Sequence, residues 1–481
     1  MMNNGTLMQY FEWYLPNDIG LWNKISNEAE NSKNIGISAL WLPPAYKGKD
    51  GKNDVGYSVY DLYDLGEFNQ KGSIETKYGS KDEYLKAIKA LKDNNIDSYV
   101  DISLDHRIGA DETEEVVVCE EDYNDRNKVI SDEKIIEAWT KFNFPNRKDK
   151  YSSFKWNSSH FDGVDWDERR KKSSIYRFKN KSWNNCVDCE YGNFDYLMGA
   201  DIDFSNEEAV QETINWSKWY LDTVGFDGIR LDAIKHISYE FITRLIDELR
   251  ESSGKELFTV GEYWHSDINV LEKYIKNTDS RMSLFDVPLH YKFFEASNSN
   301  GNFDMRNLIK DTIMERDSVK AVTFVDNHDT QIGQALQSWV QPWFKPLAYC
   351  VILLRQEGYP CIFYGDYYGI PHNDIAPIKE ILDKLMYLRL NYAYGKQNNY
   401  FDDCNIVGWT REGDEEHNNS GLAALITDGP GGSKKMYVGR KFSGCTFYDY
   451  TLNNSGKVII DEMGMGNFYV NGGSISVWIK E

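Results

Sequence analysis

A chain of 481 residues, of which 41% are hydrophobic and 14% aromatic, exceeds one ordinary domain and can fill a large core. Its net charge of -22, without a basic cluster that could neutralise phosphates, argues against a nucleic-acid partner and favours a neutral or cationic substrate. No stretch is long and apolar enough to span a bilayer, and the first residues contain neither a basic leader nor an apolar signal segment, so we expect a cytoplasmic protein.

The first hundred residues alternate short apolar strands with helices. Residues 7–14 and 37–44 are aromatic and aliphatic, as buried strands are, and residues 22–34 between them fit a helix. Ser80, with Glu83 three residues later, has the capping-box pattern that begins a second helix. This alternation indicates an α/β fold.

The regular alternation stops after a third predicted strand at residues 97–103. Residues 104–206 are rich in Trp, Asn, Asp, Ser and Lys and show no helical periodicity. We therefore predict a subdomain inserted at the end of the third strand. Its acidic run at residues 111–125 is interpreted as a solvated face rather than a metal site.

Strands and helices alternate again after the insert. Ser205 and Ser238 are predicted to cap helices that end near Gly225 and Glu251. The remaining predicted strands lie within residues 225–236, 257–263, 283–287, 321–326 and 361–364, and a helix follows at 378–394. Eight strand–helix units predict a closed (β/α)8 TIM barrel, because a doubly wound open sheet would need fewer.

The pattern changes once more after residue 395. The following segments are short and rich in Tyr, Val, Thr and Gly, with turn signals at 428–432 and 471–473. They predict an antiparallel β-sandwich domain at the carboxyl end. The expected organisation is a barrel from residues 1–103 and 207–395, an insert at 104–206 and a C-terminal domain at 396–481.

Seven cysteines, an odd number, are scattered along the chain, which suits a reducing compartment. Cys186 and Cys189 have the spacing of a redox or zinc motif, but no second pair accompanies them. We therefore expect neither a zinc ion nor a redox role at this pair.

Polar residues follow four of the predicted barrel strands, in the segments 101–106, 230–232, 261–264 and 326–329. Arg230 and Asp232 are two residues apart and point to one side of a strand, where a guanidinium keeps a carboxylate ionised, as a nucleophilic Asp requires. Alone, this pair could equally be a structural ion pair. Four strand ends that carry polar residues together indicate an active site.

The expected site contains three carboxylates, those of Asp232, Glu262 and Asp329, together with an arginine, two histidines and several aromatic side chains. It lacks a metal-ligand run such as His-x-x-x-His. Paired carboxylates without an obligatory catalytic metal suit glycoside hydrolysis, in which one acid protonates the leaving oxygen and another stabilises the cationic sugar. Aromatic rings provide flat faces for pyranose rings.

The chain resembles the alpha-amylases of glycoside hydrolase family thirteen, most closely the liquefying type of bacilli and its intracellular relatives. The similar segments are 54–57, 101–106, 194–203, 225–236, 262–264, 324–329, 343–348 and 421–432. They extend almost from end to end, and such an ordered set of motifs is specific for the family. The resemblance implies an endo-hydrolase of α-1,4-glucosidic bonds in starch, glycogen or maltodextrins. We expect a monomer, without nucleic-acid or membrane partners.

The resemblance also implies a role for each matching residue. Asp232 is similar to the nucleophile that forms a covalent glycosyl-enzyme, Glu262 to the general acid and base, and Asp329 to the third carboxylate, which grips substrate hydroxyls. For a retaining mechanism, the nucleophile and the acid should lie roughly 5 to 5.5 Å apart. The implied substrate-binding residues are Tyr57, His106, Arg230, Lys235, His236, Trp264 and His328.

The inserted subdomain contains carboxylates of the kind that calcium prefers. The resemblance implies a structural Ca²⁺ that joins the insert to the barrel between Asp105, Asp195, Asp201 and the main-chain carbonyl of His236. Asp162 and Asp203 in the insert are further candidate ligands. Asp105 stands where the family usually has Asn, and Asn184 stands where the close relatives have a bridging Asp. We therefore expect one calcium here rather than a calcium–sodium–calcium cluster. A further calcium beside the C-terminal domain is not expected, because Cys404 and Asn405 replace a His-Asp pair.

Two alternatives to the hydrolase remain. A 4-alpha-glucanotransferase or a maltogenic enzyme would use the same retaining chemistry, although Lys235, His236 and Trp264 resemble the residues of hydrolases. The loop at 369–375 is shorter than in the close relatives, which leaves product length open. A binding protein without catalysis is disfavoured because all three carboxylates are present.

Overall fold

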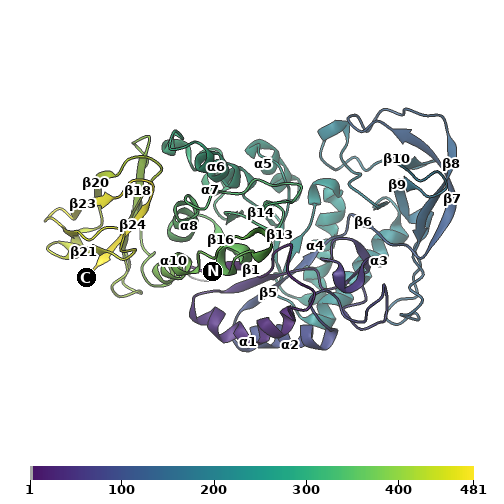
Figure 1. Cartoon of the computed structure of the whole chain (residues 1–481), viewed down its shortest axis with the longest axis horizontal. Helices are drawn as coiled ribbons and strands as arrows, with labels where there is room; N and C mark the ends of the chain where they lie inside the picture. Colours follow the sequence, from purple (N-terminus) through teal and green to yellow (C-terminus); the bar gives the residue numbers. More distant parts are fainter. Residues whose placement is uncertain (1–3) are drawn as a thin grey trace.

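The computed structural model of this protein describes residues 4–481 (Figure 1). Eight parallel strands close into a barrel in the order β1–β16–β15–β14–β13–β12–β5–β2. They are β1 (Leu7–Gln9), β2 (Ala39–Leu42), β5 (Asp97–Ile102), β12 (Gly228–Leu231), β13 (Phe258–Gly261), β14 (Ser283–Phe285), β15 (Ala321–Phe324) and β16 (Tyr359–Phe363). The predicted TIM barrel is confirmed. The predicted strands at 7–14 and 37–44 were too long, because the chain leaves the ladder as soon as it reaches the rim of the barrel.

Helices surround the barrel (Figure 1). They are α1 (Leu21–Asn34), α2 (Lys81–Asp93), α3 (Glu207–Val224), α4 (Tyr239–Ser253), α5 (Ile268–Asn277), α6 (Val287–Asn298), α7 (Ile313–Arg316), α8 (Lys345–Leu354), α9 (Tyr364–Tyr368) and α10 (Lys379–Asn391). Short 3-10 turns lie at Gly51–Asn53, Ser158–His160, Glu190–Gly192, Ile234–His236, Met305–Asn307, Pro371–Asn373 and Arg440–Phe442. Within the described residues, no helix has the length and apolar character needed to cross a membrane.

The predicted helix caps are only partly present. The capping box of Ser80 and Glu83 at the start of α2 is confirmed. Helix α3 is capped by Asn206 and not by Ser205, because the side chain of Asn206 accepts hydrogen bonds from the free N–H groups of the first turn. Ser238 occupies the N-cap position of α4, but its side chain makes no capping hydrogen bond.

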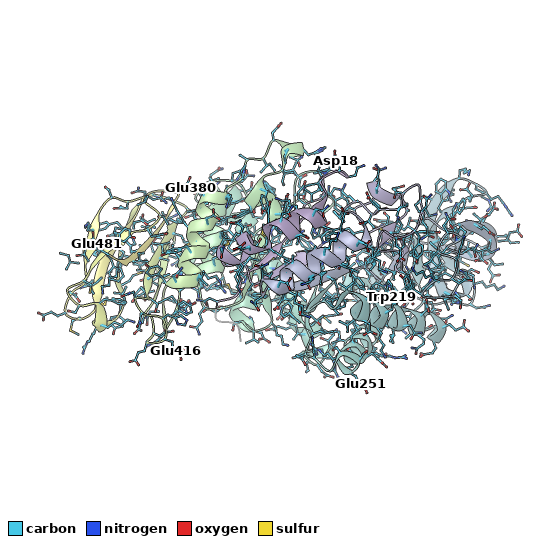
Figure 2. The ribbon with its side chains drawn as sticks, turned by 90° about the horizontal axis from the view of Figure 1, so that it is seen from below. Asp18, Trp219, Glu251, Glu380, Glu416 and Glu481 are labelled. Atoms are coloured by element: carbon cyan, nitrogen blue, oxygen red, sulfur yellow. The ribbon has the colours of Figure 1, made fainter. Side chains whose placement is uncertain are left out.

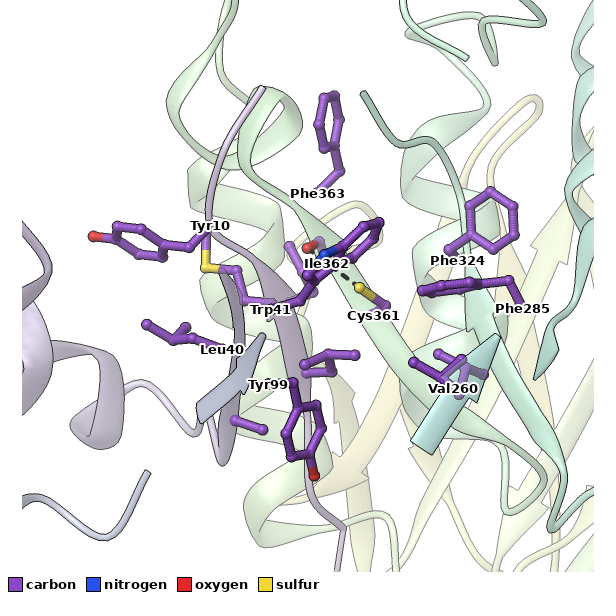
Figure 3. Packing of buried hydrophobic residues seen from close by; sticks show 14 of the residues in the cluster. Tyr10, Leu40, Trp41, Tyr99, Val260, Phe285, Phe324, Cys361, Ile362 and Phe363 are labelled. Carbon is purple, nitrogen blue, oxygen red and sulfur yellow. Dashed lines mark hydrogen bonds between the residues drawn. The ribbon is translucent and has the colours of Figure 1, made fainter. Parts of the chain in front are cut away.

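Large aromatic side chains fill the barrel interior (Figure 3). The ring centroids of Trp41 and Phe285 are 5.1 Å apart, and those of Phe285 and Phe324 are 5.7 Å apart. All three residues are buried. A barrel packed in this way is a solid core, so polar chemistry is confined to its rim.

The inserted subdomain lies at one end of the molecule and is built around a six-stranded sheet in the order β6–β11–β9–β10–β7–β8 (Figure 1). Its strands are β6 (His106–Arg107), β7 (Glu112–Glu121), β8 (Lys134–Lys141), β9 (Phe161–Asp167), β10 (Lys172–Phe178) and β11 (Ala200–Ile202), and a separate hairpin pairs β3 (Lys47–Gly48) with β4 (Val59–Asp61). The interpretation of 111–125 as a solvated face is wrong at Glu120 and Glu121. Both are buried, because Lys134 and Arg177 form ion pairs with them.

The C-terminal domain lies at the other end of the molecule (Figure 1). A six-stranded sheet, in the order β17–β18–β19–β24–β21–β22, packs against the two-stranded sheet β20–β23. The strands are β17 (Gln397–Tyr400), β18 (Ile406–Arg411), β19 (Leu422–Thr427), β20 (Gly432–Tyr437), β21 (Thr446–Asp449), β22 (Lys457–Ile459), β23 (Met465–Val470) and β24 (Ile475–Lys480). Figure 2 shows acidic side chains such as Glu380, Glu416 and Glu481 projecting from the surface, in keeping with the negative net charge.

Candidate active site

Arg230 lies at the centre of the carboxyl ends of the barrel strands and is fully buried. Its Nη1 contacts Asp101 Oδ1 at 2.9 Å and Asp232 Oδ1 at 2.5 Å, and its Nη2 lies 2.9 Å from Glu262 Oε2. Asp101 faces Arg230 directly across the β5–β12 ladder. One guanidinium therefore joins carboxylates from three neighbouring strands, which stabilises their ionised forms.

The carboxyl groups of Asp232 and Glu262 have different surroundings. The Glu262 side chain is 8% exposed, and that of Asp232 is 12% exposed. Burial raises the pKa of Glu262; Arg230 opposes this shift, and the charge of Asp232 adds to it. The backbone N–H of Ala233 donates to Glu262 Oε2 at 3.1 Å. Glu262 thus keeps its proton to a higher pH than an ordinary glutamate, as a general acid requires.

Asp329 follows β15 at the same end of the barrel. Burial raises its pKa well above the ordinary value, and the nearby charge of Glu262 adds to the shift. Its neighbour His328 receives a hydrogen bond from Gln9 Nε2 to Nδ1 at 2.9 Å if the ring is neutral, and burial lowers the pKa of this ring well below the usual range. The His328 ring stacks on Tyr57 with centroids 5.1 Å apart.

Three residues of the site received no role from the sequence. Asp101 accepts hydrogen bonds at 2.8 Å from Tyr57 Oη and from Trp41 Nε1, and burial raises its pKa to about 7 in spite of Arg230. The others are Gln9, which contacts His328, and Trp13, whose ring is parallel to that of Tyr57 at 6.1 Å. Gln9 is a polar residue inside an apolar strand, and Trp13 is a tryptophan shortly after it. These were the sequence signals that could have assigned both residues to the site.

His106 links the barrel to the insert. Its Nδ1 lies 3.1 Å from Asp105 Oδ2, and its Nε2 lies 2.9 Å from the Tyr57 carbonyl oxygen. Burial lowers the pKa of this ring, but the hydrogen bond and charge of Asp105 outweigh it, so the net shift is upward. Both ring nitrogens are thus engaged within the protein beside the predicted sugar site.

Lys235 and His236 lie on the turn that follows β12, beside the insert. Lys235 forms an ion pair with Glu190, and its Nζ lies 3.4 Å from the Trp264 carbonyl oxygen. His236 Nδ1 lies 2.8 Å from the Phe194 carbonyl oxygen. The structure therefore brings Lys235 and Trp264 together and directs the His236 ring toward the insert.

A second group of carboxylates lies inside the insert. Asp162, Asp195 and Asp201 are buried, and one oxygen of each lies within 4.8 Å of the others. Both oxygens of Asp162 and Oδ2 of Asp201 have no hydrogen-bond partner. Burial, together with the charges of Asp203 and Asp195, raises the pKa of Asp162 to about 9; burial and the charge of Asp105 raise that of Asp195 to about 7. Hard oxygen atoms without donors are the environment that a calcium ion fits.

The other predicted metal ligands surround this group less directly. Asp105 adds to the negative charge at Asp195 and Asp201 but also contacts His106. Asp203 forms an ion pair with Lys181 and accepts a hydrogen bond from a serine hydroxyl. No contact locates the main-chain carbonyl of His236 among the carboxylates within the described part of the chain.

Two sequence departures are explained by local contacts. Asn184 Nδ2 donates to Asp195 Oδ2 at 3.1 Å, where a carboxylate would repel it. Asn405 Nδ2 likewise donates to Asp428 Oδ1 at 3.1 Å near the C-terminal domain. Cys186 is half-buried, Cys189 is exposed, and both are free thiols.

Comparisons with known proteins show the family of this chain. Residues 8–386 match the family described as alpha amylase, catalytic domain, and residues 424–479 match the alpha-amylase C-terminal family. An alpha-amylase of Geobacillus stearothermophilus is 59% identical over 478 residues, which cover 99% of this chain and 87% of the relative. A cytoplasmic alpha-amylase of Escherichia coli is 42% identical, with 100% and 99% covered. The fold also matches a solved alpha-amylase of Geobacillus thermoleovorans in complex with acarbose, with a TM-score of 0.66, 16% identity and coverage of 100% and 98%.

Proposed function

The chain belongs to the alpha-amylase family, and from this premise we propose how its own residues carry out the reaction. The protein is a glycoside hydrolase that cleaves α-1,4-glucosidic bonds in α-glucans. The observation that supports the assignment of the catalytic residues is the set of contacts between Arg230 and the carboxylates of Asp232 and Glu262.

Asp232 is the proposed nucleophile. The carboxylate attacks the anomeric carbon of the sugar, and the bond from that carbon to the leaving oxygen breaks as Glu262 gives its proton to this oxygen. Arg230, 2.5 Å from Asp232 Oδ1, keeps the attacking carboxylate ionised. A covalent glycosyl-enzyme results.

The second half of the reaction reverses the proton movement. Glu262, now ionised, takes a proton from water, and the hydroxide oxygen displaces Asp232 from the anomeric carbon. Both steps invert the carbon, so the product keeps the α configuration. Asp329, whose pKa is raised by burial and by the charge of Glu262, is the proposed hydrogen-bond partner of a substrate hydroxyl.

The proposed sugar-binding wall is aromatic. Tyr57 and His328 stack at 5.1 Å beside the three carboxylates, and Trp13 is parallel to both rings at 6.1 Å. Flat rings of this kind suit the apolar face of a pyranose. Lys235 and Trp264 lie at the rim toward the insert and are the proposed contacts on the leaving-group side.

We further infer that the buried carboxylates of Asp162, Asp195 and Asp201 hold one structural Ca²⁺. Their unpartnered oxygens support this, and Asp105 and the His236 carbonyl are the proposed additional ligands. Asp203 is a weaker candidate, because Lys181 already neutralises it. The ion would tie the insert to the barrel and take no part in the bond-breaking steps.

We propose that the protein acts as a monomer, because Asp232, Glu262 and Asp329 all come from one chain. A cytoplasmic location is proposed from the name of the Escherichia coli relative. A glucanotransferase, in which a sugar replaces water in the second step, is the alternative for the same site.

The test is a time course with amylose, in which products are separated by length and their anomeric configuration is read by NMR. We expect a rapid fall in chain length and α-configured maltooligosaccharides. Glu262→Gln should reduce kcat by about 10²- to 10⁴-fold, because a general acid contributes about that much. Glu256→Gln, an exposed glutamate near the same strand, is the matched control.

Two outcomes would change the proposal. Products longer than the substrate would favour the glucanotransferase. If Glu262→Gln keeps the activity of Glu256→Gln, the proposed acid is wrong.

A further inference from the structure

A second buried ion-pair network lies behind the turn formed by residues 326–330, which carries Asp329. Lys345, the first residue of α8, is 2% exposed. Its Nζ lies 2.9 Å from Asp326 Oδ2, forms an ion pair with Asp366 and lies 3.1 Å from the ring centroid of Trp339. The strands that precede the two aspartates, β15 and β16, are neighbours in the barrel, and Phe324 and Phe363 mark their carboxyl ends in Figure 3.

Hydrogen bonds connect this network to the turn. Asp326 Oδ1 accepts from Thr330 Oγ1 at 2.8 Å, and Thr330 Oγ1 accepts from the Asn327 backbone N–H at 2.9 Å. Asn327 Oδ1 in turn accepts from the backbone N–H groups of Asp329 and Thr330, each at 2.9 Å. The side chains of Asp326, Asn327 and Thr330 therefore hold the turn, which leaves His328 to stack on Tyr57 and Asp329 to lie near the charge of Glu262.

The charges show what Lys345 contributes. Asp326 and Asp366 are both buried, and each has Lys345 as an ion-pair partner in the described structure. Asp366 has a further anchor, because Tyr349 Oη donates to it at 2.6 Å. Without the ammonium, two buried carboxylates would face each other with no cation between them, and repulsion would displace or protonate Asp326. Asp326 is the base of the turn, so its displacement would move Asp329.

We propose that Lys345 is a positioning residue for Asp329: it fixes Asp326, and Asp326 fixes the turn that sets Asp329 in the cleft. This inference rests on the proposed role of Asp329 in the reaction. It predicts that Lys345 affects the transition state more than the binding of substrate, because a misplaced catalytic group lowers kcat.

The test compares kcat and KM for a maltooligosaccharide among three network variants at a temperature where all are folded. Lys345→Met and Asp326→Asn should lose about 10- to 100-fold in kcat, with KM changed by less than about threefold. Asp366→Asn leaves the pair of Lys345 and Asp326 in place, so its kcat should stay within about twofold of the parent.

The matched control is Arg389→Met, because Arg389 is a buried cation on α10, which packs on α8. Its guanidinium donates to the carbonyl oxygens of Gly5 and Leu353, away from the turn. This variant should lower Tm and leave kcat of the folded protein unchanged. If the Lys345 network were purely structural, Lys345→Met and Asp326→Asn would likewise lower Tm and leave kcat unchanged.

The inference is overturned if Lys345→Met keeps kcat within about twofold, or if Asp366→Asn loses as much kcat as Lys345→Met. If Lys345→Met fails to fold, the kcat of Asp326→Asn is used in its place to test the inference. Asp329→Asn is measured beside them: full activity in that variant refutes the proposed role of Asp329 itself, whereas its loss together with an active Lys345→Met refutes only the positioning role.

Discussion

The protein contains two groups of buried carboxylates that differ in their counter-charge. In the barrel, Arg230 contacts Asp101, Asp232 and Glu262. In the insert, the group of Asp162, Asp195 and Asp201 has no ion-pair partner within residues 4–481, and several of its oxygens have no donor. The first group therefore carries its own cation, and the proposed calcium ion would supply one to the second.

The energetic reason is the same in both groups. Two like charges 4 Å apart repel by about 4 kcal/mol in a protein-like medium, a large part of the net stability of a folded protein. A fixed guanidinium removes this repulsion at all pH values and keeps its position during catalysis. A bound metal ion removes it as well, but only while the ion is bound, which suits a structural tie rather than a proton-transfer site.

The largest expected effect comes from removing the fixed cation with Arg230→Met. Three buried carboxylates would then repel one another, so kcat/KM should fall by at least about 10²-fold. The free energy of unfolding should fall by about 3 to 5 kcal/mol. Steady-state kinetics on a maltooligosaccharide and urea unfolding measure the two quantities.

Arg244→Met is the matched control for this variant, since Arg244 pairs with Glu207 on the protein surface. Its activity should match that of the parent. An Arg230→Met protein that keeps more than about a tenth of the parent activity would contradict the role given to this guanidinium.

A smaller effect is expected from removing the calcium ion that we propose for the insert. Chelation of calcium should lower Tm by about 4 °C, because an ion at about a thousand times its Kd contributes about 4 kcal/mol and the unfolding entropy of a chain this long is about 1 kcal/mol per degree. Differential scanning calorimetry with chelator, excess calcium and excess magnesium measures it. Equal Tm values in all three would show that the acidic group needs no metal.

The smallest effect is expected from Asn184→Asp, which adds a carboxylate beside Asp195 and removes the amide donor at 3.1 Å. Without metal, the variant should be about 1 to 3 kcal/mol less stable than the parent. With metal, calorimetric titration should give two calcium ions per chain in place of one. Asn185→Asp, at an exposed neighbouring position, should bind the same number as the parent. If Asn184→Asp binds the same number of calcium ions as the parent, residue 184 does not contribute to the metal site.

Much of the architecture could be predicted from periodicity alone. The eight strands and the change of pattern after residue 395 are local signals, since a strand of apolar residues needs only its own sequence to be recognised. The cap predicted at Ser205 was wrong because Asn206 lies beside it, and only the backbone direction selects which of the two residues caps the helix. The interpretation of Glu120 and Glu121 as part of a solvated face was wrong because their ion-pair partners lie on other strands.

The sequence by itself determined the barrel, the insert, the family and the polar residues at the strand ends, because each of these depends on residue type and order along the chain. Tertiary structure alone decided which charges meet. Arg230 and Asp101 are 129 positions apart and become neighbours only through the register of β5 and β12. Lys345 reaches Asp326 only because α8 begins beside the end of β15. Such contacts depend on distances set by packing, and no local pattern records them.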